Sequence, residues 1–503
     1  MPVDQSFTSD RDWCPVDNPH LASIDTKAGQ YEFFLVLSFL LALTTNNGLP
    51  LTVSVFREFG DHPSNVGLIF VLVYFFFKKK RTDFKIPRYI LISLAVYFFD
   101  MSINIFSAVL NVRLFHFSHP PVVTWILQSG VFFWPPLAVL GWIFVISRFD
   151  ILGRNYNRFH KISCWIAAVS LFAFINIIMS FAHRFVPDVP SGLFAQGDLR
   201  FLIGDPIGSE VQDIAFRPSV FTTEPSHYAI WCAAIWPFLV FVDTTKVAKR
   251  QAWVGRALGL LIALSGALNL ARTGVALYSL QIAALLACVF LFRLFSASTR
   301  LGLLLLAPIV SVALLVSVGS IFDLSKNQSA LSRWSAELAA LSVFNDHPLL
   351  GAGIGGYQTH VASALPDFAL QSRELKGYNS LVNYAFNPSA GSMFFKLGAE
   401  LGLLGMAAVA TMVIGPILLL IWRYRQIRNS GSGLPPPSAP ILAVVLCSTA
   451  AVGSWYSNDD ANQPTIPLFA AMAIVIEMSL GQSSRANMRT AANEVPTIGG
   501  GGD

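Results

Sequence analysis

Long apolar stretches, separated by polar segments of very unequal length, make up most of the chain. A helix needs about 20 apolar residues to cross a bilayer. Runs near this length recur at about 31–47, 64–77, 87–110, 122–147, 162–186, 227–242, 255–271, 273–292, 301–322, 393–422, 440–456 and 465–480. The pattern predicts an all-α polytopic membrane protein with about twelve transmembrane helices. We expect a single membrane domain over 31–480, between a cytoplasmic tail (1–30) and a disordered cytoplasmic tail (481–503).

Composition agrees with this class. Hydrophobic residues make up 54% and charged residues only 13%, whereas a soluble chain carries about a quarter charged residues. The mean hydropathy is +0.57, which excludes a soluble enzyme with a single anchor. The net charge of +5 does not indicate a nucleic-acid partner, because membrane topology explains where the basic residues lie. The five cysteines show no metal-ligand spacing, and no metal or cofactor is expected.

The basic residues orient the chain. Most of the 34 Lys and Arg fall in alternate segments between the apolar runs, and cytoplasmic loops carry such an excess. Both termini are therefore predicted in the cytoplasm. Two long segments, about 187–226 and 323–392, then face outward as periplasmic loops.

The second of these loops contains an amphipathic stretch, R-W-S-A-E-L-A-A-L-S-V-F-N-D-H-P-L-L-G-A-G-I-G-G-Y (333–357). A helix there carries one apolar face, formed by Leu331, Trp334, Leu338 and Leu341. Such a helix between two spans is expected to lie along the bilayer surface, with Arg333 at headgroup depth and able to pair with Glu337. The alternative is a loop helix that merely covers the bundle. The G-x-G-x-x-G spelling at 351–356 does not predict a nucleotide site, because no strand precedes it.

Outward arginines are the candidate anion ligands. An arginine near hydrocarbon is costly unless it meets an anion or a carboxylate, and its planar fork suits phosphate. Arg217, Arg272 and Arg333 are predicted to bind a lipid-linked diphosphate. For Arg200 and Arg373, within the long loops, a side chain that reaches lipid headgroups is the favoured interpretation.

Four motifs occur in order: F-T-T-E-P-S-H-Y (221–228), A-R-T-G (271–274), R-W-S-A-E-L-A-A-L (333–341) with H-P-L-L-G-A-G-I-G (347–355), and K-L-G-A-E-L-G-L-L-G (396–405). Together they resemble the O-antigen polymerase and O-antigen ligase superfamily, over roughly 215–410. The resemblance implies a multi-pass glycosyltransferase of the bacterial inner membrane. It would act at the periplasmic face on sugars linked to undecaprenyl diphosphate, without a nucleotide sugar or a metal.

The same resemblance assigns roles. Arg272 and Arg333 match arginines thought to hold the diphosphate, and Arg217 is a looser match to a third. Besides the bilayer and the lipid-linked oligosaccharide, a chain-length regulator and a flippase are the expected partners. The reaction is attack of an acceptor hydroxyl on the anomeric carbon, with the lipid diphosphate as leaving group.

The general base is left open. Ligases carry a His shortly before the E-L-G-L-L-G helix, but N-Y-A-F-N-P-S-A-G-S (383–392) contains none. The candidate catalytic residues are Glu224, His347 and His360, with His227 a further possibility. Glu224 is the first choice, although a carboxylate there also suits a helix N-terminus, and His347 before Pro348 also suits a turn.

The predicted function is polymerisation of lipid-linked repeat units into O-antigen, capsule or exopolysaccharide. Loop 323–392 would cover the reaction site, with polar residues near the sugar: Tyr357, Tyr378, Asn379, Asn383 and Tyr384. The nearest alternative is a ligase that moves finished glycan to lipid A core or protein. An alternative of another class is a secondary transporter, which would show related halves and broken helices; neither is visible in the sequence.

Two acidic residues lie inside apolar runs. Asp100 falls in the third run with Ser102 and Asn104, and Glu477 falls near the end of the last. Intramembrane acids mark ion pathways in some proteins, whereas an acid near a span end is expected to pair locally.

Overall fold

The fold is all-α, as predicted. The computed structural model describes residues 68–69, 71–73, 86–110, 121–165, 167–168, 225–268, 272–290, 328–371, 375, 390–429, 438–457 and 465–493, and no strand occurs among them. The helices are α4 (Arg88–Leu110), α5 (Pro121–Arg148), α8 (Pro225–Val240), α9 (Lys249–Leu268), α10 (Arg272–Phe290), α12 (Gln328–Asp346), α13 (Gly356–Ala364), the 3-10 helix η5 (Asp367–Gln371), α15 (Met393–Val413), α16 (Gly415–Asn429), α17 (Ser438–Ser457) and α18 (Thr465–Asn493).

Several helices coincide with predicted apolar runs, but two boundaries differ. The run 393–422 is divided at Ile414 into α15 and α16, and α18 extends beyond its apolar run to Asn493. Among the described residues, two helices are long and apolar enough to cross a membrane, Arg88–Ser107 and Met393–Val413. Runs 31–47 and 301–322 lie outside the described part of the chain, so the count of twelve spans stays a prediction.

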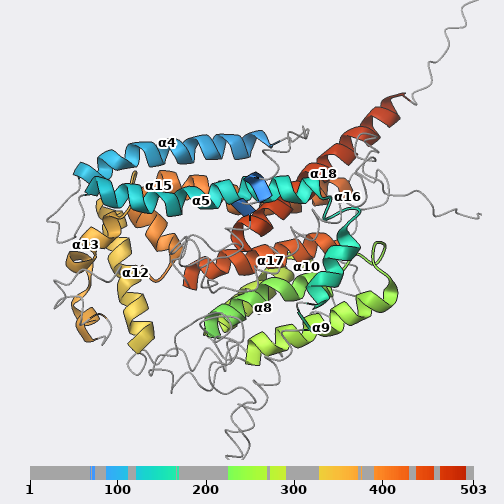
Figure 1. Cartoon of the computed structure of the whole chain (residues 1–503), viewed down its shortest axis with the longest axis horizontal. Helices are drawn as coiled ribbons and strands as arrows, with labels where there is room; N and C mark the ends of the chain where they lie inside the picture. The colour runs from blue at the N-terminus through green and yellow to red at the C-terminus, as the bar shows by residue number, and fades with distance from the viewer. Residues whose placement is uncertain are drawn as a thin grey trace, which may run out of the picture.

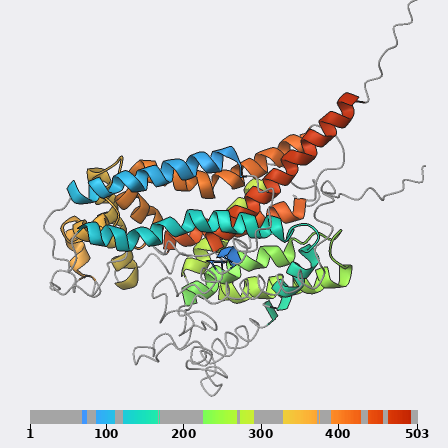
Figure 2. The same cartoon turned by 45° about the horizontal axis from the view of Figure 1, so that its top comes forward.

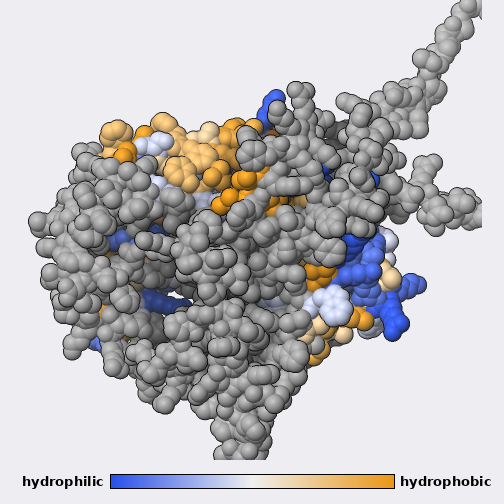
Figure 3. All heavy atoms as spheres, viewed as in Figure 1, coloured by the Kyte–Doolittle hydropathy of each residue, from blue (hydrophilic) through white to orange (hydrophobic). Residues whose placement is uncertain are grey.

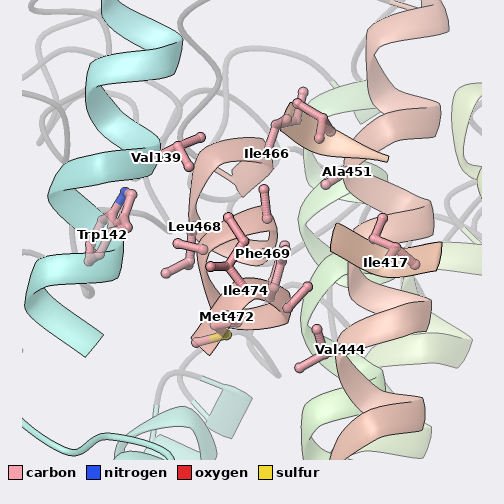
Figure 4. Close-up of a cluster of buried hydrophobic side chains, with 14 of the residues drawn as sticks. Val139, Trp142, Ile417, Val444, Ala451, Ile466, Leu468, Phe469, Met472 and Ile474 are labelled. Atoms are coloured by element: carbon pink, nitrogen blue, oxygen red, sulfur yellow. The ribbon is translucent and has the colours of Figure 1, made fainter. Parts of the chain in front are cut away.

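The helices form an elongated bundle (Figures 1 and 2). Helix α4 packs on α15 and α5, α5 packs on α18, and α17 joins this part to α8 and α10. Helices α12 and α13 lie at one end of the bundle, opposite the C-terminal end of α18, and α12 runs across the direction of α4 and α5 (Figure 1). The main core is apolar and draws on α5, α16, α17 and α18, whose side chains point toward one another (Figure 4).

Helix α4 exposes large apolar side chains and buries a row of polar ones among apolar neighbours, whereas a helix on the surface of a soluble protein exposes its polar face. Its outer face exposes large side chains, which gather as a hydrophobic area over this helix in Figure 3: Leu91, Ile92, Phe99 and Phe106. Its inner face buries a polar stripe at steps of three and four residues: Ser93, Tyr97, Asp100, Asn104 and Ser107. Lipid is the surrounding in which this arrangement is stable, since apolar surface then needs no burial against protein.

The stripe compensates for a break in α5. Pro135 and Pro136 lie inside α5, and Pro136 has no N–H to bond the carbonyl of Phe132, four residues earlier. The Tyr97 hydroxyl donates to that carbonyl at 2.8 Å. A side chain of α4 thus replaces a missing backbone donor of its neighbour, as irregular helices in membranes require.

Helix α15 contains a break that is not visible in the sequence. Gly402 has φ 64° and ψ −163° inside α15, a region essentially limited to glycine. The loop 347–356 docks on this break backbone to backbone: Ala352 N–H donates to Ala399 O at 2.7 Å, Gly353 N–H to Glu400 O at 3.1 Å, and Leu403 N–H to Pro348 O at 2.9 Å. The motifs H-P-L-L-G-A-G-I-G and K-L-G-A-E-L-G-L-L-G are therefore two halves of one structural unit.

The docking predicts that Gly402→Ala destabilises the protein. A Cβ on Gly402 would stand 2.5 Å from Gly351 N and from the Leu349 carbonyl, and the backbone conformation alone costs about 1–3 kcal/mol for a residue with a side chain. We expect a lower thermal midpoint in detergent, measured by scanning fluorimetry.

Gly415→Ala is the matched control, because a Cβ there would meet only Thr411 Cγ2, at 3.8 Å. Equal midpoints for the Gly402 and Gly415 variants would contradict the docking described here.

Candidate functional site

The end of the bundle formed by α12, α13 and the start of α15 collects most of the described site candidates. Helix α12 presents two faces there. The inner face consists of small, buried side chains: Ser332, Ser335, Ala336, Ala339 and Ala340. Of the large apolar side chains that were expected on one face, Trp334 and Leu341 are exposed, and Leu331 and Leu338 are half-buried. Small residues let α12 approach α15 and α13 closely, and the outward Trp and Leu suit a lipid surface.

Arg333 and Glu337 lie one helical turn apart on α12, beside the turn that begins α15. Gly391 occupies this turn with φ 72°. A Cβ on Gly391 would stand 3.2 Å from Arg333 O and 3.5 Å from Glu337 Cγ, so the backbone at 391 lies directly on α12. The exposed Arg333 side chain and the Glu337 carboxyl therefore share one small region with the N-terminal end of α15.

Glu337 is a charged residue with unusual burial. It is 8% exposed. Burial raises the pKa of the Glu337 carboxyl to about 7, against a smaller lowering by the nearby Arg333 charge. A carboxyl that exchanges its proton near neutral pH, beside a guanidinium group, has the properties of a general base. Glu337 is not among the sequence candidates for the base, because its spacing of four from Arg333 predicts only an ion pair.

His347 and His360 come together as neighbours. Their ring centroids are 5.6 Å apart in an edge-to-face arrangement, and His360 Nδ1 lies 2.9 Å from the Gly356 carbonyl. His347 follows the C-terminal end of α12 and Arg333 lies near its start, which separates them by about 20 Å of helix at 1.5 Å per residue. The histidine pair and Arg333 do not share one small anion in this conformation.

The other predicted residues are only partly described. Arg272 is the first residue of α10, so its backbone lies at the junction with α9, as expected. Arg217 and Glu224 lie outside the described residues. Tyr357, expected near the sugar, is fully buried, and its hydroxyl donates to the Ala336 carbonyl at 3.2 Å; it packs α13 on α12 instead.

Two residues of α4 hold the loop 347–356 in place. Asn104 donates from Nδ2 to Leu350 O at 2.8 Å and to Glu400 O at 3.0 Å, and its Oδ1 accepts from Ile354 N–H at 2.5 Å. Ser107 Oγ donates to Gly351 O at 2.6 Å. In the sequence, Asn104 stands out only as a polar residue within an apolar run. The polar residues that recur every three or four positions along α4 are the pattern that could have indicated a buried, hydrogen-bonded Asn104.

An apolar cleft opens among the helices that carry this end of the bundle. Its walls include the two prolines of α5 and side chains from α15, α17 and α18: Pro135, Pro136, Met393, Leu397, Trp455 and Ile466. Met393, one of its lining residues, lies two residues from Gly391 in the chain.

No protein-family model matches the chain, and no curated protein sequence matches it either. The resemblance to the O-antigen polymerase and ligase superfamily therefore stays a prediction from the motifs.

The raised pKa of Glu337 predicts a pH-dependent effect of Glu337→Gln on stability. The folded-state pKa, about 7, lies above the ordinary value of 4.5, so the folded protein favours the protonated form. The stability of the folded protein is unaffected by this group below pH 4.5, decreases between about pH 4.5 and 7, and levels off above 7. In that interval the unfolded chain releases the Glu337 proton while the folded protein still holds it. Gln cannot ionise, so the variant should melt at a higher temperature than the wild type above pH 7.

This difference in thermal midpoint should disappear at about pH 4.5. Asp367→Asn, an exposed acid in the same region, serves as control and should show no such trend. A midpoint difference between Glu337→Gln and wild type that is constant across this range would contradict the burial effect.

Proposed function

We propose that this protein is a glycosyltransferase of the bacterial inner membrane that polymerises undecaprenyl-diphosphate-linked oligosaccharide repeat units at the periplasmic face. The product is O-antigen, capsule or exopolysaccharide. One observation carries the proposal: two motifs distant in sequence, at 347–355 and 396–405, dock on each other beside the R-W-S-A-E motif of α12. The segments 333–341, 347–355 and 396–405, which belong to two of the four motifs, thus lie together at this end of the bundle.

The position of basic side chains in the folded bundle supports the orientation that we propose for the chain in the membrane. Hydrophilic side chains, among them Lys249 and Arg250, gather where α9 begins, at the end of the bundle away from α12 (Figure 3). Cytoplasmic loops carry this excess of basic residues. The α12 end is then periplasmic, in a multi-pass protein of about twelve spans with both termini in the cytoplasm.

The proposed substrate class rests on a charge beside an apolar surface. Arg333 is an exposed guanidinium group on α12, which also exposes Trp334 and Leu341. A lipid diphosphate has both properties, an anionic head and a hydrocarbon tail. In the proposal Arg333 binds the head together with Arg272 and Arg217, and the tail stays in the surrounding lipid.

Transfer proceeds by substitution at the anomeric carbon. The acceptor hydroxyl of one repeat unit attacks that carbon, the bond from the carbon to the diphosphate oxygen breaks, and its electron pair leaves with the lipid diphosphate. The guanidinium groups stabilise the charge that grows on the leaving group. The hydroxyl proton passes to a carboxylate, for which Glu337 is the best described candidate; Glu224 is the alternative.

Loss of the protein should remove polymer while single repeat units remain, as seen on glycan gels of a deletion strain. In complementation, Arg333→Ala and Arg272→Ala should lower chain extension by about 100-fold or more, and Arg→Lys should fall between, since a point charge replaces a planar fork. Arg425→Ala, an exposed arginine near the end of α16, is the matched control and should keep wild-type ladders.

The wild type and the arginine variants must be present in the membrane at equal levels, so that a difference in chain length reflects activity. Normal ladders from the Arg333 and Arg272 variants would refute the diphosphate role. Finished glycan that fails only to reach lipid A core or protein would identify a ligase.

The role of Glu337 as base predicts a pH profile. A base must be ionised, so transfer by the wild type in proteoliposomes should decrease as the pH falls through about 7, the pKa of this carboxyl. Glu337→Gln should lower the rate by about 100-fold or more and remove this part of the profile. A full rate at pH 6 in either protein would assign the base elsewhere.

A secondary transporter is the second candidate, and the break of α15 favours it. Transporters place broken helices and buried acids near the centre of the membrane, and Gly402 interrupts α15 close to the buried Asp100. Solute uptake into reconstituted vesicles, with unchanged glycan length in the deletion strain, would support this function instead.

A further inference from the structure

Asp100 differs from the other members of the α4 stripe. Tyr97, Asn104 and Ser107 each donate to a backbone carbonyl of another segment. Asp100 is 0% exposed, and neither of its carboxyl oxygens has a hydrogen-bond partner among the described residues. It therefore contributes no bond to the packing, although it lies between residues that do.

The position of the Asp100 carboxyl depends on a glycine of α15. A Cβ on Gly405 would stand 2.7 Å from Asp100 Oδ2, so the carboxyl occupies the space that a side chain at 405 would fill. Gly405 lies three residues beyond the Gly402 break. The acid is thus built into the contact between α4 and α15.

Among the described residues, no basic side chain forms an ion pair with the Asp100 carboxyl. Within α5 the only charged residue is Arg148, at its last position, and the other titratable residues of α4 and α15 are Arg88, Tyr89, Tyr97, Lys396 and Glu400. The Lys396 ammonium lies 6.0 Å from the centroid of the Phe132 ring. An isolated carboxylate in apolar surroundings costs several kcal/mol, and the group takes a proton instead.

We propose that Asp100 is a proton-binding site that is occupied as long as α4 packs on α15, and that loss of the proton releases the loop 347–356. The second part follows from the spacing of the stripe. Asn104 and Ser107, one and two turns beyond Asp100 on the same face, hold Leu350, Gly351 and Ile354 of that loop. Hydration of an ionised Asp100 requires α4 to separate from α15, which breaks these bonds.

The proposal does not depend on glycosyl transfer. The loop 347–356 carries His347 and borders α12, so its release at high pH would open the outer end of the bundle whatever reaction or transport occurs there. Glu477 shows the contrast: it is also buried in a helix, but its carboxylate pairs with Arg423, as expected for an acid near a span end.

Infrared spectroscopy tests the proton directly. With aspartate carboxyls labelled with carbon-13, the purified wild-type protein in lipid should show the carbonyl band of a neutral aspartic acid at pH 7, distinct from Glu400. Asp100→Asn should remove the band, and Glu477→Gln should leave it. The wild-type measurement needs no variant to fold. Carboxylate bands alone at pH 7, with or without added sodium ion, would overturn the proton site.

Hydrogen exchange tests the release. After correction for the intrinsic rate, wild-type amides of 347–356 should lose protection as the pH rises from 6 to 9, by about tenfold or more, while Asp100→Asn, a permanent mimic of the neutral acid, keeps it. Glu477→Gln should behave as the wild type. Identical pH dependence of protection in the wild type and in Asp100→Asn would overturn the coupling of the proton to the loop.

Discussion

The docking of one backbone on another at Gly402 is the constraint on which the end of the bundle that carries α12 and α13 depends. Loop 347–356 and helix α15 exchange hydrogen bonds with no side chain between them, and a Cβ at Gly351 or Gly402 would collide with the opposite backbone. The break leaves α15 peptide groups without helical partners, and the loop supplies them. Asn104 of α4 then bonds both sides of the junction. Three segments distant in sequence are fixed in this way.

The same junction explains why α12 can hold charged residues in defined positions. The turn at Gly391 precedes α15 and lies on the α12 backbone, and Tyr357 packs α13 on α12 from the other side. The Glu337 carboxyl is thereby buried while Arg333 stays exposed, although both lie on one helix. A buried carboxyl with a pKa near neutrality is a product of this packing, and a surface helix without these contacts would not provide it.

The sequence predicted the helical class and many helix boundaries because apolar runs and turn residues act locally. The apolar run predicted at 87–110 coincides with helix α4, and the amphipathic stretch that begins near 328 coincides with helix α12. It did not predict which face of α12 packs inward, since small residues at membrane interfaces give a weak hydrophobic signal. Nor did it predict the role of Glu337 or Asn104, which depends on segments far away in the chain. The break at Gly402 was hidden because glycine is common in membrane helices.

The substitution of the Tyr97 hydroxyl for the missing donor of Pro136 constrains biogenesis. In hydrocarbon the Phe132 carbonyl would otherwise lack a donor, at a cost of several kcal/mol, and the Tyr97 hydroxyl provides one. Helices α4 and α5 follow each other in the chain, so they satisfy this carbonyl as soon as both have been synthesised. The contact between α4 and α5 can therefore form before helix α15 has been synthesised.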